Sequence, residues 1–427
     1  MELVGWIGVV LLLILVLGGV PLAFSFVAAA LVIGMFAMNL PLTAIGHLTF
    51  ESVNSYPLLA APFFVLAGNL LVQGGALEVL RGLLRALVGN TTGGLPIAAI
   101  FLSAVLGAIS GSAAACLAIL AALMIPIFTS MNYERRFTAG LLVTSAELGL
   151  IVPPSIFLIL FGAFNRVSII ELFAAGMAAG LLIAILMAIT AVLISRKRGY
   201  SKMPVLESGE RRKAIQEAFP LIGFPVLVLG GIYGGLFSPT ESASVAVFYA
   251  LVLGTAFYRK LTWPGFAEAL VKTAKTTGII YFLVVGADLL ARTVGYLEVH
   301  TLITNLISDL DLSALGFLLV VNALLLVVGL FFSSLPMVIV ILPLFLPAAV
   351  ALGIDPVLYG VLGVICASIG EITPPFGPQL WLAQPLCGVR MGEILREASG
   401  FLLAWLVAVV LITLFPAIIL FPVELLR

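Results

Sequence analysis

Two short stretches, LGLIVPPSIF at residues 148–157 and IGEITPPFG at residues 369–377, each place a Pro-Pro pair inside a long apolar run. Proline removes a backbone amide donor and clashes with the preceding turn, so a helix that contains Pro-Pro must break there. The two pairs are 221 residues apart (374 − 153 = 221). The two stretches therefore predict two broken helices, over residues 137–164 and 357–384, at equivalent positions of an internal repeat.

Other landmarks repeat with the same spacing. Two more pairs lie 221 residues apart, namely Ser112 with Ser333 and Pro126 with Pro347. The chain is thus predicted to consist of two repeats, residues 1–195 and 214–427. The polar segment 196–213, the longest in the chain, is the natural linker between them.

The composition of the chain is typical of a membrane protein. Of its 427 residues, 63% are hydrophobic and only 9% are charged, whereas a soluble domain carries about 25% charged residues. The apolar runs are long and do not alternate as barrel strands do. We therefore expect an all-α polytopic membrane protein with about ten spans, placed at 3–19, 22–38, 58–73, 137–164, 172–195, 214–235, 240–257, 276–290, 357–384 and 399–421. Five spans per repeat make the second repeat inverted, and inverted repeats with broken helices are a common plan of secondary transporters.

Two further apolar stretches, 93–131 and 314–350, are too long for one span and contain no charged loop that would divide two. Small residues interrupt each stretch, Ser110-Gly111-Ser112 in the first and Ser333-Ser334 in the second. We predict two re-entrant hairpins, because irregular backbone is tolerated at membrane depth where it is buried in protein or lines a cavity. The alternative is that these small residues only let helices pack closely.

The basic residues predict the orientation. With the N-terminus outside, seventeen of the twenty Lys and Arg residues fall in inner loops, and only Arg166, Arg292 and Arg427 fall outside or near the outer face. This asymmetry follows the positive-inside rule. We therefore expect a multi-pass protein with a periplasmic N-terminus and a cytoplasmic linker at 196–213.

Several functional classes are not supported by the sequence. The formal net charge is zero, which gives no indication of a nucleic-acid partner. The cysteines Cys116, Cys366 and Cys387 lie in separate apolar segments and form no ligand cluster with His47 or His300, so neither a metal centre nor a disulfide is expected. The chain also has no P-loop, HExxH or GxSxG motif. We therefore expect no enzymatic activity and no cofactor.

The breaks offer ligands for ions of both signs. Carbonyls freed by proline, together with Ser and Thr hydroxyls, are hard oxygen ligands that suit a dehydrated alkali cation. The opposite ends of the breaks are half-helix N-termini, which attract anions. We expect the substrate anion at Ser112, Pro153, Pro154, Ser155, Pro374 and Pro375. A single proline in a membrane helix is more often a simple kink, and that alternative stays open.

Ionisable residues inside a membrane segment are rare and indicate function. Glu147 and Glu371 precede the two Pro-Pro pairs but are not equivalent in the repeat, because 147 + 221 = 368. Either residue tunes a proton or cation site or faces solvent in a cavity. Asp288 and Arg292, four residues apart on one helix, are expected to pair with each other. No Lys or Arg is expected at mid-depth near the breaks, which favours coupling to sodium over capture of an anion by a basic side chain.

Five motifs resemble those of a known family. They are PFFVLAGNLL at 62–71, GAISGSAAACLAILAALMIP at 107–126, LGLIVPPS at 148–155, GGLFSPTESA at 234–243 and GEITPPFG at 370–377. Over its whole length the chain resembles the large, DctM-like membrane subunit of tripartite ATP-independent periplasmic (TRAP) transporters.

The resemblance implies an ion-transporter fold with a scaffold and an elevator-type transport domain in the bacterial inner membrane. It also implies a small four-helix membrane subunit and a soluble periplasmic binding protein as partners. Transport would be sodium-dependent uptake of organic acids such as C4-dicarboxylates or sialic acid, with Na⁺ as the coupling ion. The sodium-binding residues carried over from the family are Ser110, Gly111, Ser112, Ser333, Ser334, Gly370 and Thr373, with the carbonyls before Pro153 and Pro374.

Two departures and two alternatives accompany this resemblance. Glu147 and Glu371 stand where smaller or apolar residues are expected, which leaves the ion stoichiometry open. The first alternative is a stand-alone sodium/dicarboxylate symporter of the same superfamily, which needs no binding protein. A channel or a non-transporting scaffold would belong to a different class.

The charge asymmetry generates a topological prediction. A cysteine introduced at Ser208 is expected to react with thiol reagents only from the cytoplasmic side, because the flanking segment carries the basic linker. Labelling by a membrane-impermeant reagent added outside intact cells measures this directly. Reaction from outside would overturn the orientation.

Overall fold

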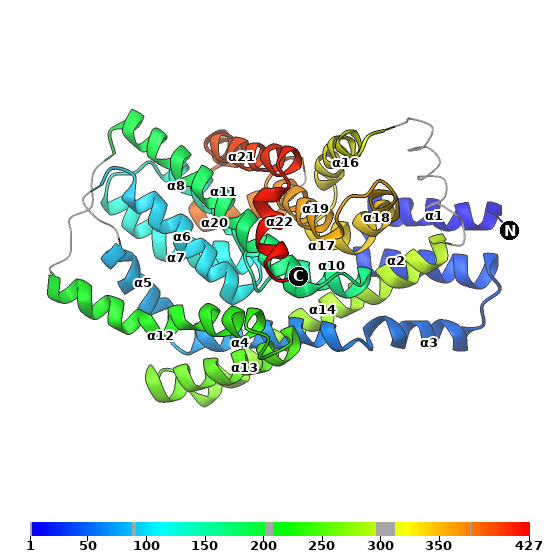
Figure 1. The fold of residues 1–427 in the computed structure, drawn as a ribbon, viewed down its shortest axis with the longest axis horizontal. Helices are drawn as coiled ribbons and strands as arrows, with labels where there is room; N and C mark the ends of the chain where they lie inside the picture. The colour runs from blue at the N-terminus through cyan, green and yellow to red at the C-terminus, as the bar shows by residue number, and fades with distance from the viewer. Residues whose placement is uncertain (1, 88–90, 201–207, 296–311, 376) are drawn as a thin grey trace.

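A computed structural model describes residues 2–87, 91–200, 208–295, 312–375 and 377–427, and all regular elements in these ranges are helical. The first half contains α1 (Glu2–Leu17), α2 (Leu22–Val32), η1 (Ile33–Ala37), α3 (Leu42–Val53), η2 (Tyr56–Leu59), α4 (Ala60–Gln73), α5 (Ala76–Leu87), α6 (Gly94–Ser110), α7 (Ala113–Ser130), α8 (Arg135–Ala146), α9 (Leu148–Ile151), α10 (Ile156–Asn165) and α11 (Ile169–Arg198). The second half contains α12 (Ser208–Tyr233), α13 (Pro239–Val252), η3 (Leu253–Phe257), α14 (Trp263–Gly295), α16 (Ala314–Gly329), α17 (Ser334–Pro336), η4 (Met337–Ile341), α18 (Leu342–Ala351), α19 (Pro356–Glu371), α20 (Pro378–Cys387), α21 (Met391–Leu414) and α22 (Ala417–Glu424). Figure 1 shows their arrangement.

The long helices present apolar faces to the outside of the molecule. Within the described ranges, nine helical segments are long and apolar enough to cross a membrane. On α11 an exposed stripe recurs every four residues, at Leu181, Ile185, Ile189 and Leu193. Such a stripe would be a liability in water but matches the hydrocarbon of a bilayer. The prediction of an all-α polytopic membrane protein is therefore confirmed.

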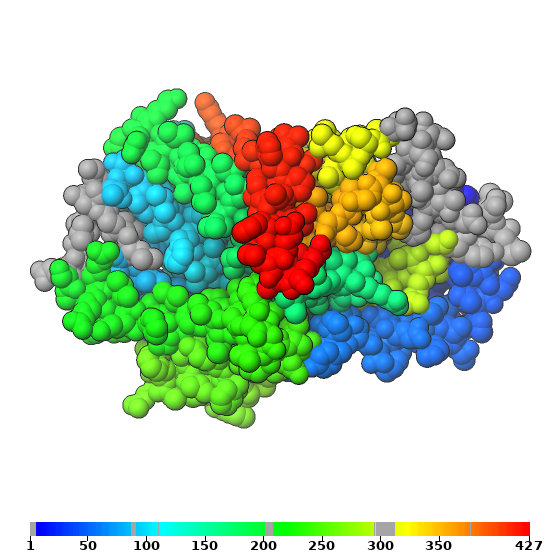
Figure 2. All heavy atoms as spheres, viewed as in Figure 1, coloured from blue at the N-terminus to red at the C-terminus, as the bar shows by residue number. Residues whose placement is uncertain are grey.

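The helices pack in two groups. In one, α13 and α14 pack on α4, α2 packs on α14, and α5 packs on α12. In the other, α8 packs on α6, α7 and α21, and α19 packs on α16, α11 and α21. Figure 1 shows α4, α12 and α13 along one edge and the second group above them, and Figure 2 shows the C-terminal helices between α11 and the α18–α19 region. The two groups meet where α4 contacts α6 and α10, and where α14 contacts η4.

Backbone features repeat between the two halves of the chain. Short π-helical turns end α2 and α13, as η1 and η3, and their first residues, Ile33 and Leu253, are 220 residues apart. The non-glycine residues Asn39 and Arg259 follow them with the same left-handed φ of 54° and the same spacing. These features support the internal repeat independently of the proline pairs.

Glycine lets the first arm of each hairpin approach the broken helix in the same half of the chain. A Cβ added to Gly107 on α6 would lie 2.2 Å from the Cα of Gly149, and one added to Gly370 on α19 would lie 2.5 Å from the carbonyl oxygen of Gly329 on α16. Both spacings are far too short for a side chain, so the two backbones touch. The pairs are related by the repeat, because the differences are 222 (329 − 107) and 221 (370 − 149).

The hairpin stretches fold as helix pairs. The stretch 93–131 forms α6 and α7, which pack on each other, and the stretch 314–350 forms α16 followed by α17, η4 and α18. The broken spans are also observed, as α8–α9–α10 and as α19–α20. The expected pair of Asp288 and Arg292 forms, with Asp288 Oδ2 2.7 Å from Arg292 Nε.

Other elements differ from the prediction. The span expected at 276–290 is part of one continuous helix, α14, because its interior glycines do not stop a helix that is packed on both sides. Residues 42–53, which lie between two predicted spans, form α3. The linker is shorter than expected, since α11 continues to Arg198 and α12 begins at Ser208. The sequence also predicts two amphipathic arms, at 76–90 and 296–313, before the two hairpin stretches. Residues 76–87 of the first arm form α5, and most of the second lies outside the described residues.

The glycine contact predicts a test of the fold. Gly107→Ala is expected to lower the free energy of unfolding by about 1–3 kcal/mol, because the two backbones must move apart to admit the added methyl group. The thermal unfolding midpoint in detergent measures this loss of stability. Gly278→Ala on α14 is the matched control, because a Cβ there meets nothing within 4 Å. That control is expected to be neutral or slightly stabilising, since alanine is a better helix former than glycine. Equal midpoints for the two variants would contradict the close crossing.

Candidate functional site

The first broken helix is capped by its own side chains. α9 ends at Ile151, and α10 begins after Ser155. The Ser155 hydroxyl donates to the carbonyl of Leu150 and accepts a hydrogen bond from the Leu158 amide at 3.3 Å. The Pro153–Pro154 peptide bond is cis, and Pro153, Pro154 and Ser155 are all buried. These residues are therefore placed at the break, but the serine oxygen is already used locally.

The second broken helix has the same form with different side chains. α19 ends at Glu371, the Thr373 hydroxyl donates to the Ile369 carbonyl at 2.6 Å, and the Gly377 amide donates to the Thr373 carbonyl at 3.1 Å. Pro374 and Pro375, joined by a cis bond, are partly exposed and exposed respectively. The second break is thus more open than the first.

The hairpin tips lie against these breaks. At the first tip Gly111 has a left-handed φ of 58°, and the Ser112 hydroxyl accepts from the Ala115 amide at 3.4 Å. At the second tip the Ser334 amide donates to Glu371 Oε1 at 3.0 Å. The second hairpin is therefore tied directly to the end of α19.

A cavity of about 230 Å³ joins the tips and the breaks. Its walls come from both tips, both broken helices and α14. The lining residues that define it are Gly111, Ser112, Leu150, Leu335, Glu371 and Gln379. Leu150 and Glu371 are equivalent in the repeat (371 − 150 = 221), so one wall is apolar and the matching wall is acidic.

A second cavity, of about 360 Å³, continues from the first. The two share Ser112, Ile156 and Thr276, and the second extends between α4 and α7 past Asn69 to Lys272 on α14. Lys272 is half exposed and paired with Glu268 at 2.6 Å. The described lining of the cavity at the breaks contains no Lys or Arg, and Lys272 lines only the second cavity. Lys272 stands there because α14 already begins at Trp263 and continues through residue 276.

The predicted site residues divide into three groups. Gly111 and Ser112 line the cavities, and Ser334 reaches them through its hydrogen bond to Glu371. Gly370 and Thr373 flank Glu371, and Ser333 is half-buried beside Ser334. The remaining residues, Pro153, Pro154, Ser155, Pro374 and Pro375, shape the breaks. Ser110 ends α6, and its side chain lies outside the described part of the chain.

Besides Lys272, the sequence interpretation missed three uncharged polar residues of the cavity walls. Asn69, whose amide donates to Thr273 Oγ1 at 3.0 Å, lies within the PFFVLAGNLL motif, where a lone polar residue in an apolar span was the available signal. Thr276 and Gln379 gave no such signal, because Thr276 stands among other polar residues and Gln379 directly follows a proline, so neither is a lone polar residue in an apolar run.

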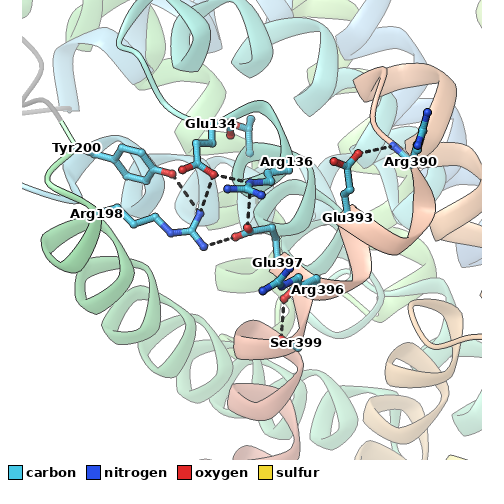
Figure 3. Close-up of polar contacts among 10 residues, drawn as sticks. Glu134, Arg136, Arg198, Tyr200, Arg390, Glu393, Arg396, Glu397 and Ser399 are labelled. Carbon is cyan, nitrogen blue, oxygen red and sulfur yellow. Dashed lines mark hydrogen bonds and ion pairs between the residues drawn. The ribbon is translucent and has the colours of Figure 1, made fainter.

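A network of charges joins three helices of the second group at one end (Figure 3). Arg198 at the end of α11 contacts Glu397 on α21 at 2.7 Å and Glu134 at 3.4 Å. Arg136 on α8 contacts the same two carboxylates, at 2.6 Å from Glu134 and 3.4 Å from Glu397. The hydrogen bond from Arg136 lowers the pKa of the Glu134 carboxyl below its ordinary value. The ionised Glu134 carboxylate therefore stabilises the fold at any pH above the ordinary carboxyl pKa. This stabilisation is lost as the pH falls through the lowered pKa of Glu134.

A related contact stands at the other end of the same helices. Arg427, at the C-terminal end of the chain, lies 2.7 Å from Glu171 on α11 and 2.9 Å from Asp355 before α19. Asp355 and Glu134 are equivalent in the repeat (355 − 134 = 221), and each precedes the first segment of a broken helix. An arginine therefore ties each broken helix to its neighbours.

Two hairpins whose tips meet two broken helices around a cavity, inside an apolar helical shell, define a polytopic membrane transport protein. The family model of the tripartite ATP-independent periplasmic transporter, DctM component, matches residues 9–418. The chain belongs to this family.

Comparisons with individual proteins agree. The chain is 33% identical over 415 residues to the sialic acid TRAP transporter large permease protein SiaM of Vibrio cholerae, covering 97% of this chain and 96% of that protein. It is 33% identical over 369 residues to the C4-dicarboxylate TRAP transporter large permease protein DctM of Pseudomonas aeruginosa, covering 86% of each. The crystal structure of the Alcanivorax borkumensis YdaH transporter matches with a TM-score of 0.66 at 16% identity over 87% of each chain, which supports the fold.

The charge network makes a prediction about stability. Glu397→Gln is expected to destabilise the protein by about 1–3 kcal/mol, between the values typical of exposed and of buried ion pairs, because both arginines lose a nearly buried partner. Glu393→Gln, an exposed carboxylate one turn earlier on α21, is the control. Thermal unfolding in detergent measures both variants, and an unchanged midpoint for Glu397→Gln would contradict a stabilising role.

Proposed function

We propose that this chain is the permease of a sodium-driven importer of small organic acids. The observation that carries this proposal is the convergence of both hairpin tips and both broken helices on one cavity. Its neighbour, lined by Ser112, Asn69 and Lys272, adds a hydroxyl, an amide and a cation, which suit a carboxylate. The relatives named for sialic acid and C4-dicarboxylates transport substrates of this chemical class.

Two partners are proposed from the family. The description "tripartite" and "periplasmic", together with the name "large permease" of the relatives, supports a periplasmic binding protein and a small four-helix membrane subunit. The orientation with a periplasmic N-terminus in the bacterial inner membrane is proposed from the distribution of basic residues.

Sodium is proposed to bind where hairpin tips meet breaks. The proposed ligands are the oxygens of Ser110, Gly111, Ser112, Ser333, Ser334, Gly370 and Thr373. The Thr373 hydroxyl donates its proton to the Ile369 carbonyl, so its oxygen lone pairs face away from that bond and suit a cation. The substrate anion is proposed to contact Ser112 and the half-helix ends at Pro153, Pro154, Ser155, Pro374 and Pro375.

The proposed movement is of the elevator type. The inverted repeats, residues 1–195 and 214–427 around a linker at 196–213, would supply one hairpin and one broken span each to a moving body. The packing adds α11 and α21 to this body, because both helices contact the broken spans and share the arginine contacts. The group of α2, α4, α13 and α14 would then be the scaffold.

A second candidate is a stand-alone sodium/dicarboxylate symporter. The fold alone is compatible with it, since the cavity lies entirely within this chain. Uptake of radiolabelled succinate and sialic acid into vesicles that contain the purified protein and the small membrane subunit, with and without the binding protein, separates the two. Uptake that needs no soluble partner would favour the symporter, and no sodium-dependent uptake of either acid would contradict the proposed substrate class.

The sodium ligands generate a mutational prediction. Ser112→Ala and Thr373→Ala are each expected to raise the sodium concentration for half-maximal uptake about tenfold, which corresponds to about 1.4 kcal/mol. Each substitution removes one hard oxygen ligand at a depth where water replaces it poorly. Ser130→Ala, at the far end of α7, removes a hydroxyl bonded only to its own helix and serves as the control. Sodium activation identical to that of the control would exclude these two ligands.

A further inference from the structure

Glu147 is a buried carboxyl group without a polar partner. It links α8 to α9, one turn before the first break, and its side chain has no exposed surface. Neither of its oxygens has a hydrogen-bond partner among the described residues. By contrast, Glu371 receives hydrogen bonds from the Ser334 amide and from the Gln379 side chain.

In the described part of the chain no basic residue is positioned to neutralise Glu147. The helices that pack on α8 and α9 include α6, α7, α10, α19 and α20, and none of these carries Lys, Arg or His. The basic members of the charge network are Arg136 on α8 and Arg198 on α11. Arg136 is eleven residues from Glu147, or about 16 Å along a helix. No cation of the described chain therefore lies beside this carboxyl.

The titratable groups of the described chain that face Glu147 are a carboxyl and a thiol. Glu371 on α19 and Cys116 on α7 are close enough to interact with it electrostatically. Cys366 on α19 is buried. Cys387 on α20, like Glu397 on α21, belongs to the far end of α8, near Arg135 and Arg136.

An isolated carboxylate in such surroundings costs far more than a neutral carboxylic acid, which loses only one or two hydrogen bonds. We propose that Glu147 is a proton-binding site of the transport domain, which holds a proton in this state and exchanges it with water once in each transport cycle. The inference rests on the proposed transport function and adds a second coupling ion to it. The step is a simple proton transfer: an O–H bond forms at the carboxylate on one side of the membrane and breaks on the other.

The cavity comes within one helical turn of Glu147. Leu150, whose amide donates to the Glu147 carbonyl at 3.0 Å, lines the 230 Å³ cavity. A single turn of helix thus separates the buried carboxyl from the cavity that would carry the substrate. A small movement of the first break would open this path, whereas in the present structure it is closed.

Infrared difference spectroscopy on the purified full-length chain in lipid tests proton occupancy without any substrate. The wild-type protein is expected to show the carbonyl band of a protonated carboxylic acid at neutral pH, and Glu147→Gln is expected to lose it. Glu371→Gln and Glu134→Gln, which remove a neighbouring and an exposed carboxyl, are expected to keep it. Absence of the band in the wild type, or its survival in Glu147→Gln, overturns the proposal.

Proton movement tests the exchange. Vesicles that contain the protein and an internal pH indicator are expected to acidify during sodium-driven uptake of succinate or sialic acid. In Glu147→Gln sodium-dependent uptake is expected to persist at a reduced rate while the acidification is lost. Uptake by the wild type without acidification, or acidification that is unchanged in Glu147→Gln, overturns the proton coupling. If Glu147 binds sodium instead, wild-type uptake occurs without acidification and Glu147→Gln changes the sodium dependence of uptake.

The two experiments separate this inference from the proposed function. If neither acid is transported, the proposed substrate class fails, while the infrared band still decides whether Glu147 holds a proton. If uptake is sodium-dependent and the band is absent, the transport function stands and the proton site is wrong.

Discussion

The structure depends on breaking two helices where water cannot replace lost hydrogen bonds. In an apolar interior each backbone group that proline frees needs a partner within the protein. The Ser155 hydroxyl supplies one for the Leu150 carbonyl, which Pro154 leaves without its helical donor. In the second break the Thr373 amide supplies one for the Gly370 carbonyl, which Pro374 leaves without its helical donor. Because the breaks are satisfied locally, the chain can hold an irregular segment at membrane depth and leave the adjacent space free as a cavity.

The breaks are useful only if the hairpin tips reach them, and the glycine contacts provide this. Gly107 on Gly149 and Gly329 on Gly370 bring two backbones together just before each break. From that crossing the first arm of each hairpin has only three or four more residues before its turn, so the hairpin tip lies beside the break. The repeat therefore preserves a spatial relation between arm and break.

The proline pairs and the apolar stretches were sufficient to predict the broken helices and the hairpins, because both signals are local in sequence. The polar walls were not predictable in this way. Lys272 lies in the cavity because α14 continues through a region that reads as a loop, and Arg198 meets Glu397 from 199 residues away. Such contacts follow from how helices pack, which no spacing in the sequence records.

The two halves share a backbone plan but differ in where they place negative charge. The repeat aligns Glu371 with Leu150, and both residues line the cavity. It aligns Glu147 with Ser368, and both residues are buried away from it. Ser368 satisfies itself by donating to the Val364 carbonyl, whereas Glu147 has no partner among the described residues. The second break thus presents a hydrogen-bonded carboxylate to the cavity, and the first buries a carboxyl behind an apolar wall. A symmetric frame with asymmetric charges can give its two breaks different roles, because the same backbone geometry surrounds an acid that faces the cavity in one half and an acid shielded from it in the other.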